Sequence, residues 1–264
     1  MRVLADLSSR HPLCLRGGDS SGDENIKSKA ADGAATRLLE QYRAQGRVAD
    51  IELYNKAIVE NWHADRTEVC LRLFQDLQKE GLTPNKWTYN AVACACSRSG
   101  NAKAAVKIVE DMKRGGIEPD DTTYNAVIGA YAKGGGWREA LKYLCEMRSN
   151  SLYPSELTYN TVMATCAQAG EPLKAKEVYK EMLERGLHPD STSFSAVLSA
   201  YCAAGQWHEV LEMAGELGAS GVAMDSVIAN AIMIAHAMLR QWDRALTHFE
   251  GPPYAYCPLE EHVP

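Results

Sequence analysis

The sequence lacks several features that would each indicate a particular class of protein. No apolar run approaches the roughly 18 residues that a membrane-spanning helix needs, so we expect no membrane partner. The eight cysteines are scattered without a CxxC pair, which argues against a zinc site or a disulfide framework and for reduced, buried thiols. An excess of basic residues is also lacking. The net charge of −6 disfavours binding of nucleic acid through an overall positive field.

Catalytic signatures are lacking as well. The H-x-E and P-C-x-x-C pattern of zinc deaminases is absent, and the seven histidines are dispersed along the chain. Cys94 and Cys96 are close in sequence, but on a helix they point in different directions, which favours packing over metal binding. We therefore expect no enzyme activity, no metal and no cofactor.

What the sequence does contain is a repeat of 35 residues. Related tetrapeptides that begin at residues 53, 88, 123, 158, 193 and 228 are LYNK, TYNA, TYNA, TYNT, SFSA and IANA. Small residues keep the same interval at Cys70, Ala105, Ala140, Ala175, Val210 and Ala245. Five full units follow one another without a gap, and they are 51–85, 86–120, 121–155, 156–190 and 191–225.

The repeats divide the chain into three expected parts. Residues 34–50 fit the second half of a unit and residues 226–250 begin another, so the repeat domain is expected to span 34–250. Residues 1–33 are rich in Ser, Gly and Asp without a period and are expected to be flexible. Residues 251–264 form a proline-rich tail.

Each unit is predicted to be a pair of antiparallel helices. Apolar side chains recur at i, i+3, i+4 and i+7 in both halves of a unit, in Tyr124–Tyr131 and again in Ala140–Met147. The glycines at 134–136 separate the two helices, and Thr122 and Thr123 are candidate N-caps of the first one. Such a pair cannot cover its own apolar stripe, so an all-α solenoid is expected.

These units resemble pentatricopeptide repeats of the P type. The resemblance covers about 34–250 and is carried by the T-Y-N opening, the alanine of the second helix, E-M near its end and the G-x-x-P-D closure. The tetratricopeptide repeat, the nearest competitor, has a 34-residue period and a different Trp/Gly/Tyr pattern. The resemblance implies a right-handed α-solenoid of stacked antiparallel helix pairs that binds single-stranded RNA, and not DNA, with one base per repeat on its concave face.

In this family the fifth and the last residue of each unit form the pair that reads a base. An Asn amide has donors and an acceptor that can address the Watson–Crick edge of a pyrimidine. The matching pairs are Asn55 with Asn85 for C or U, Asn90 with Asp120 for U, Asn125 with Ser155 for C, Asn160 with Asp190 for U, and Ser195 with Asp225 for G. The resemblance therefore implies a 5′-YUCUG-3′ core. The alternative is that such an Asn only caps a helix or bonds locally.

Two further columns are given roles by the resemblance. The second residue of a unit stacks on the base, a role that suits Trp87, Leu157 and Val227 but not Glu52. The thirteenth residue contacts phosphate, and only Arg98 and Lys133 are full cations there. Trp137, Trp207 and Trp242 form another column, which we interpret as packing residues.

The distribution of charge bears on affinity and on partners. Units 86–120 and 121–155 together hold 10 basic and 7 acidic residues, whereas 191–225 holds four acidic residues and no basic one. We therefore expect modest affinity for RNA with a shallow salt dependence. Five readers specify too few bases for a unique transcript, which implies a protein partner or effector.

A scaffold for protein or peptide ligands is the alternative function, supported by the acidic unit 191–225. Family habit suggests a role in RNA processing, stability or translation in a chloroplast or mitochondrion. The N-terminal segment gives little support for targeting, because it contains acidic residues that transit peptides lack.

Overall fold

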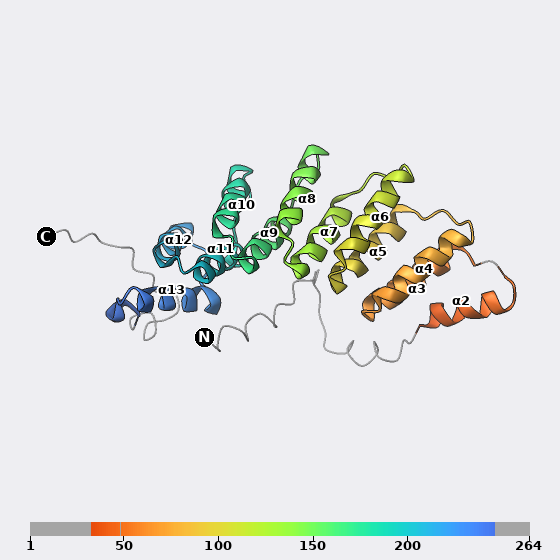
Figure 1. The fold of residues 1–264 in the computed structure, drawn as a ribbon, viewed down its shortest axis with the longest axis horizontal. Helices are drawn as coiled ribbons and strands as arrows, with labels where there is room; N and C mark the ends of the chain where they lie inside the picture. The colour runs from red at the N-terminus through yellow and green to blue at the C-terminus, as the bar shows by residue number, and fades with distance from the viewer. Residues whose placement is uncertain (1–32, 48, 246–264) are drawn as a thin grey trace. The chain divides into compact units, whose positions relative to one another are not determined.

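The computed structural model describes residues 33–47 and 49–245, and every regular element in them is an α-helix (Figure 1). The expected flexible segment, except for residue 33, and the expected proline-rich tail lie outside the described residues. The chain divides into two compact units, one up to Pro84 and one from Asn85 onward. None of the described helices is long and apolar enough to cross a membrane.

The described part of the first compact unit contains three helices. They are α2 (Ala34–Ala44), α3 (Ile51–His63) and α4 (Thr67–Lys79). Helix α3 packs against both neighbours, and its Tyr54 and Ile58 are fully buried. Its polar residues also hold α2, because the Glu60 carboxylate accepts the main-chain N–H of Ala35 at 3.0 Å and Asn61 donates to Thr36 Oγ1 at 2.8 Å.

The second compact unit is a stack of helix pairs in two layers. Its helices are α5 (Lys86–Ser99), α6 (Ala102–Arg114), α7 (Asp121–Gly134), α8 (Trp137–Ser149), α9 (Glu156–Gln168), α10 (Pro172–Glu184), α11 (Ser191–Ala204), α12 (Trp207–Ser220) and α13 (Ser226–Met238). The first helices of successive repeats, α5, α7, α9, α11 and α13, contact one another in order. The second helices α6, α8, α10 and α12 pack against the first helices. This arrangement confirms the predicted α-solenoid.

The last residue of each predicted repeat caps the first helix of the next. In α7 the cap is Asp120, whose carboxylate accepts the N–H of Thr123 at 3.1 Å. The expectation that Thr122 or Thr123 caps this helix is therefore wrong. Thr123 lies at the third helical position, where its hydroxyl accepts the N–H of Asp120 and completes a capping box.

The core follows the predicted columns. The small residues Ala105, Ala140 and Ala175 are fully buried where the two helices of a repeat approach each other. Gly135 ends α7 with φ 70°, a left-handed conformation that a glycine adopts without steric penalty. Cys166 is also buried, and burial raises the pKa of its thiol to about 11.

Two expectations about packing hold only in part. Trp137 and Trp207 are half-buried against the stack, but Trp242 is 60% exposed. Among the cysteines, Cys96 is buried as expected, whereas Cys145 is exposed on α8. Cys145 lies on α8, which packs against α7 and α9 on its inner side, and no described helix packs on its outer face.

Charged side chains connect the second helices of neighbouring repeats. Arg148 on α8 contacts Glu181 on α10 at 2.7 Å, and the hydroxyl of Tyr159 donates to the same carboxylate at 2.9 Å. Lys113 and Glu146 repeat this arrangement between α6 and α8. One repeat further on, the position of the cation is occupied by Leu183, which is 45% exposed.

Candidate nucleic-acid interface

The fold brings together the fifth residue of one repeat and the last residue of the same repeat, 30 positions later in the sequence. The fifth residue lies in the second turn of a first helix, and the last residue is the N-cap of the next first helix. Because successive first helices pack side by side, the two side chains meet. The structure shows this for the four predicted pairs that lie wholly within the second compact unit, although Asn125 and Ser155 meet through an intervening hydroxyl.

The pair of Asn90 and Asp120 is joined by direct hydrogen bonds. The Asn90 amide nitrogen donates to both carboxylate oxygens of Asp120, at 3.1 and 3.0 Å. On the other side, the Thr123 hydroxyl donates to the Asn90 amide oxygen at 2.6 Å. Lys86 adds a positive charge, with its Nζ 3.3 Å from Asp120. Lys86 was not among the site residues predicted from the sequence, although its place at the first position of a repeat offered a signal.

The pair of Asn160 and Asp190 repeats this geometry on α9 and α11. The Asn160 amide nitrogen donates to Asp190 Oδ1 at 3.1 Å, and the Ser193 hydroxyl donates to the amide oxygen at 2.6 Å. Asn160 is only 4% exposed. The same polar contacts therefore form in both repeats that combine a fifth-position Asn with a terminal Asp.

The pair of Asn125 and Ser155 has a different connection. The Thr158 hydroxyl donates to the Asn125 amide oxygen at 2.7 Å, and the same hydroxyl lies 3.0 Å from Ser155 Oγ. Ser155 offers no carboxylate to accept from the amide nitrogen. The orientation of this amide therefore depends on Thr158.

In the pair of Ser195 and Asp225 the reader is a hydroxyl and not an amide. Ser195 Oγ donates to Asp225 Oδ2 at 3.0 Å, and Ser191 donates to the same oxygen at 2.7 Å. Asp225 Oδ1 accepts the N–H of Ile228 as the cap of α13. This carboxylate thus holds a helix end and a reader at once.

The environment of Asp120 and Asp190, the last residues of two repeats, favours their ionised form. Burial raises the pKa of Asp120, but hydrogen bonds from the Thr123 N–H and from Asn90, together with Lys86, outweigh it, so the pKa lies below its ordinary value. Asp190 has a lowered pKa for the same reasons, with Ser193 and Asn160 as donors. An ionised carboxylate only accepts hydrogen bonds, so it must face the nitrogen end of an Asn amide.

For three other predicted readers or partners, the structure does not describe the geometry of the pair. Asn55 and Asn85 lie in different compact units, so their geometry as a pair is not described. Asn230 on α13 is exposed, and the residue that would pair with it lies outside the described part of the chain.

The predicted stacking and phosphate-contacting residues are accessible to different degrees. Trp87 is 50% exposed and Val227 36% exposed, whereas Leu157 is half-buried. The Lys133 ammonium group donates to the main-chain carbonyl of Arg98, which brings the two predicted phosphate contacts together near the ends of α5 and α7.

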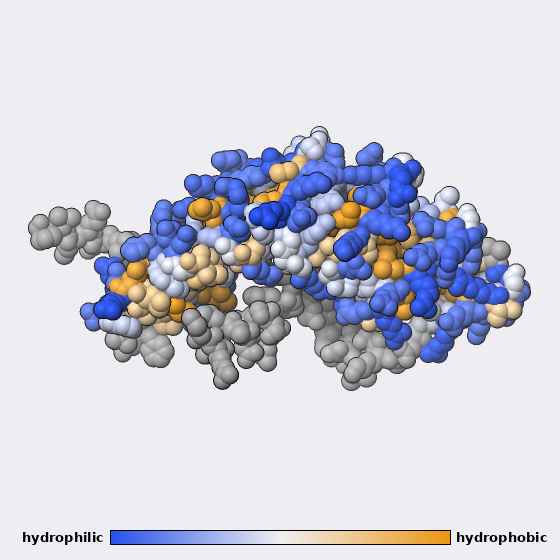
Figure 2. All heavy atoms as spheres, in the orientation of Figure 1, coloured by the Kyte–Doolittle hydropathy of each residue, from blue (hydrophilic) through white to orange (hydrophobic). Residues whose placement is uncertain are grey.

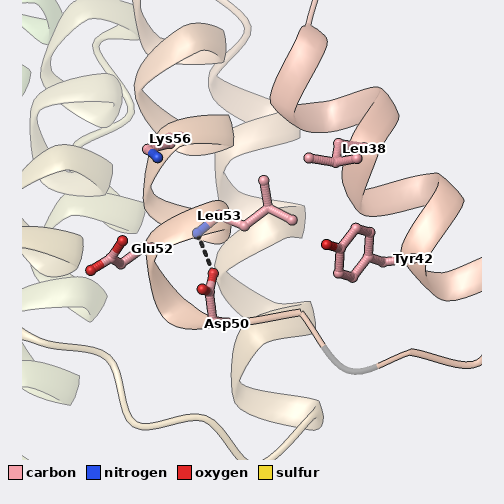
Figure 3. Close-up of a pocket in the computed structure, with 6 residues that line it drawn as sticks. All are labelled: Leu38, Tyr42, Asp50, Glu52, Leu53 and Lys56. Atoms are coloured by element: carbon pink, nitrogen blue, oxygen red, sulfur yellow. Dashed lines mark hydrogen bonds between the residues drawn. The ribbon is translucent and has the colours of Figure 1, made fainter.

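A hollow of about 270 Å³ lies in the first compact unit, between α2 and the beginning of α3 (Figure 3). Leu38 and Tyr42 line it from α2. The other lining residues are Asp50, Glu52, Leu53 and Lys56. Asp50 is committed to capping α3 through the N–H of Leu53 at 2.8 Å. This hollow was not predicted from the sequence and has no counterpart in the repeat pattern.

The described residues contain no group of three or more His, Cys, Asp or Glu side chains placed to hold a metal ion. Figure 2 shows hydrophobic surface gathered near α13. Ile234 and Met238 of that helix are exposed.

Family models match much of the chain. A model described as the pentatricopeptide repeat domain matches residues 72–134 and 107–169. A model of the PPR repeat family matches 154–203, and a PPR repeat model matches 192–222. Together these matches cover more than half of the sequence. A comparison with curated protein sequences gives no match.

Solved structures of similar architecture include the pentatricopeptide repeat protein PPR10 from maize, with a TM-score of 0.64 and 27% sequence identity. The match covers 86% of this chain and 33% of the maize chain. The chain therefore spans about a third of the maize structure. The PPR domain of Arabidopsis thaliana protein-only RNase P 1, in complex with tRNA, matches with a TM-score of 0.59 and 15% identity, over 80% of this chain and 100% of that one. Nuclear proteinaceous RNase P 2 from A. thaliana matches with a TM-score of 0.60 and 17% identity, over 77% of this chain and 43% of that one. At these identities the two RNase P proteins show a shared fold only.

Proposed function

Because the chain belongs to the pentatricopeptide repeat family, we propose that it binds single-stranded RNA and contacts one base with each repeat. The observation that carries the proposal is the recurrence of one polar arrangement on α5, α7 and α9. In each, an Asn amide is held at its oxygen by a hydroxyl from the next first helix. A local cap would not require such an arrangement at the interval of the repeat.

The unused hydrogen-bonding capacity of the readers supports the proposed bases. If the Asn90 amide shares one hydrogen between the two Asp120 oxygens, its second hydrogen and the second lone pair of its oxygen, beside Thr123, remain for a base. A pyrimidine edge offers a matching donor and acceptor. The Ser195 hydroxyl donates its hydrogen to Asp225 and can therefore only accept from a base, which suits the N–H donors of guanine.

The surrounding side chains would supply affinity without base specificity. Trp87 offers an exposed aromatic face, and stacking on such a face contributes about 1–3 kcal/mol per base. Leu157 and Val227 would cover bases with apolar surface. Arg98 and Lys133 would contact phosphate, and so short a cationic stretch supports modest affinity.

The proposed role is binding rather than catalysis, in chloroplast or mitochondrial RNA processing, stability or translation. Five readers specify few bases, so a protein partner or effector is part of the proposal. We propose no binding of DNA.

A gel-shift titration tests the proposal. RNA with a YUCUG core is compared with the same RNA carrying those bases in scrambled order, at two salt concentrations. Tighter binding of the YUCUG RNA at both concentrations is expected. Equal binding of the two RNAs at both concentrations would show that the readers do not select bases.

A scaffold for a protein or peptide is the second candidate. It is favoured by the exposed Ile234 and Met238 on α13 and by repeat 191–225, which has four acidic residues and no basic one. Binding of neither RNA in the titration would favour it.

A further inference from the structure

The third residue of a repeat contacts the reader of the preceding repeat. Thr123, Thr158 and Ser193 each donate a hydroxyl hydrogen to the amide oxygen of an Asn on the neighbouring first helix, at 2.6, 2.7 and 2.6 Å. All three hydroxyl residues are buried. Because they are buried, they could act on a base only through the Asn side chains that they contact.

The capping box occupies one lone pair of the hydroxyl oxygen and leaves its hydrogen for a second partner. The hydroxyl oxygen of Thr123 accepts the N–H of Asp120 at 3.2 Å, and that of Thr158 accepts the N–H of Ser155 at 3.2 Å. A hydroxyl that accepts from a backbone N–H has its single hydrogen left to donate. The oxygen of the Asn amide lies 2.6 or 2.7 Å from the hydroxyl, whereas the N-cap oxygen, the other oxygen acceptor within reach, lies 2.9 or 3.0 Å away, so the shorter bond is the one to the amide. This donation requires the oxygen end of the Asn amide to face the hydroxyl.

The side chain at this position matches the type of reader. An amide has two different ends and can be bound in two orientations, whereas a hydroxyl reader has one oxygen and no such ambiguity. Behind the three Asn readers the third residue is Thr or Ser, and behind Ser195 it is Ile228. Ser195 is held by Asp225 alone.

We propose that the third residue of a repeat is a positioning residue, which sets the orientation of the preceding Asn amide and thereby the order in which its donor and acceptor are presented to the base. The inference rests on the proposed function, since it assigns the cause of base selection at that same interface. Its strongest consequence concerns Asn125. Asp120 and Asp190 also orient their Asn partners, but Ser155 has no carboxylate, so Thr158 alone fixes the amide that would read the third base.

The test uses the full chain and four RNAs that differ only in the third base of the YUCUG core. Thr158→Val keeps the shape of the side chain and removes the hydroxyl. We expect its preference for C over the purines at that base to fall about fivefold, the effect of one net hydrogen bond, with preferences at the second and fourth bases unchanged. Thr158→Ser should retain the wild-type preference, because Ser193 makes the same contact from this position.

Thr165→Val is the matched control for the loss of a buried hydroxyl. Thr165 is fully buried on α9 and donates only to the carbonyl of Thr161 in its own helix, so its removal should leave base preferences unchanged. Ser193→Ala is a smaller change that tests the proposal at the fourth base should Thr158→Val fail to fold. Its loss of preference should be smaller, because Asp190 still holds Asn160.

The outcomes separate the inference from the proposed function. A wild-type chain that prefers C, together with Thr158→Val and Ser193→Ala variants that bind all RNAs with unchanged preferences, overturns the positioning role and leaves RNA reading intact. A wild-type chain without any base preference overturns both. A selective loss at the third base alone supports the inference.

Discussion

At the scale of single residues, one side chain can serve both folding and recognition. Asp120 caps α7 through the Thr123 N–H and also holds Asn90 through its amide nitrogen. An oxygen at an N-cap contributes about 0.5–2 kcal/mol to stability. A substitution at the last residue of a repeat therefore changes the stability of the next helix together with the proposed base preference, and the two effects need separate measurements.

The readers should be exchangeable between repeats. Asn125→Thr combined with Ser155→Asp places a hydroxyl reader beside a carboxylate, as Ser195 lies beside Asp225. We expect the preference at the third base to move from C toward G, because the hydroxyl would donate to the carboxylate and accept from the base. Titration against the four third-base RNAs measures this change. An unchanged preference for C would contradict the assignment of Asn125 as a reader.

The charge on Asp120 should make stability depend on pH. Its pKa is lower in the folded chain than in the unfolded one, so its contribution is present above the unfolded pKa and is lost as pH falls through the folded pKa. Asp120→Asn keeps a good cap but removes the charge. We expect lower stability than the wild type at pH 7, because the contribution of the charge is lost, and a smaller further loss in acid, measured by urea unfolding between pH 7 and pH 3. A loss in acid equal to that of the wild type would contradict this expectation.

At the scale of helices, equivalent ion pairs join the second helices of successive repeats, from α6 to α8 and from α8 to α10. The equivalent ion pair is missing between α10 and α12. Arg148 and Glu181 make the ion pair from α8 to α10, with Tyr159 as a third member. Between α10 and α12 the equivalent positions hold Leu183 and Glu216, and both are exposed. Lys176 and Glu212 form an ion pair between these two helices at 3.6 Å, but the positions equivalent to Arg148 and Glu181 hold none.

Leu183→Arg should restore the equivalent ion pair. The gain should be small, about 0.2–1 kcal/mol, because ion pairs at exposed positions are screened by water and salt. Thermal unfolding at low and high salt measures it, and the gain should diminish at high salt. Leu183→Gln is the control, since it removes the apolar surface without adding charge. An equal gain from Gln would mean that loss of the exposed Leu, and not the ion pair, is responsible.

The helix pairs and the meeting of Asn90 with Asp120 could be predicted from the sequence, because a strict period places equivalent residues in equivalent surroundings. The hydroxyl contacts could not. Thr123 was predicted to be a cap but lies at the third helical position. A Thr before an apolar stripe suits either position, and the course of the backbone decides between them. The ion pair of Lys86 with Asp120 depends on how side chains of adjacent helices approach each other, which the period does not specify.

At the scale of the whole molecule, charge is divided along the sequence. The repeats 86–120 and 121–155 are net basic, and the repeat 191–225 has no basic residue. Arg98 and Lys133 lie together on first helices, on the same elements as the Asn readers. The net charge of −6 thus conceals a short region suited to phosphate.

Removing both of these cations should weaken RNA binding without changing base preference. For Arg98→Gln with Lys133→Gln we expect affinity for YUCUG and scrambled RNA to fall by the same factor. The slope of log affinity against log salt should become shallower by about 1.4, at about 0.7 per phosphate contact in single strands. Arg138→Gln with Lys142→Gln, on α8 of the other layer, is the matched control. A larger effect from the control pair would place the phosphate contacts on the second helices.

The dependence of each reader on the next repeat limits how these modules can be recombined. Grafting residues 86–120 into another solenoid would transfer Asn90 and Asp120 but leave Thr123 behind. The host would then supply whatever residue follows, and a host with an Ile at that place, as Ile228 in this chain, would receive the amide without its orienting hydroxyl. A transferable cassette must therefore overlap its neighbour by three residues, and the functional module is longer than the 35 residues by which the sequence repeats.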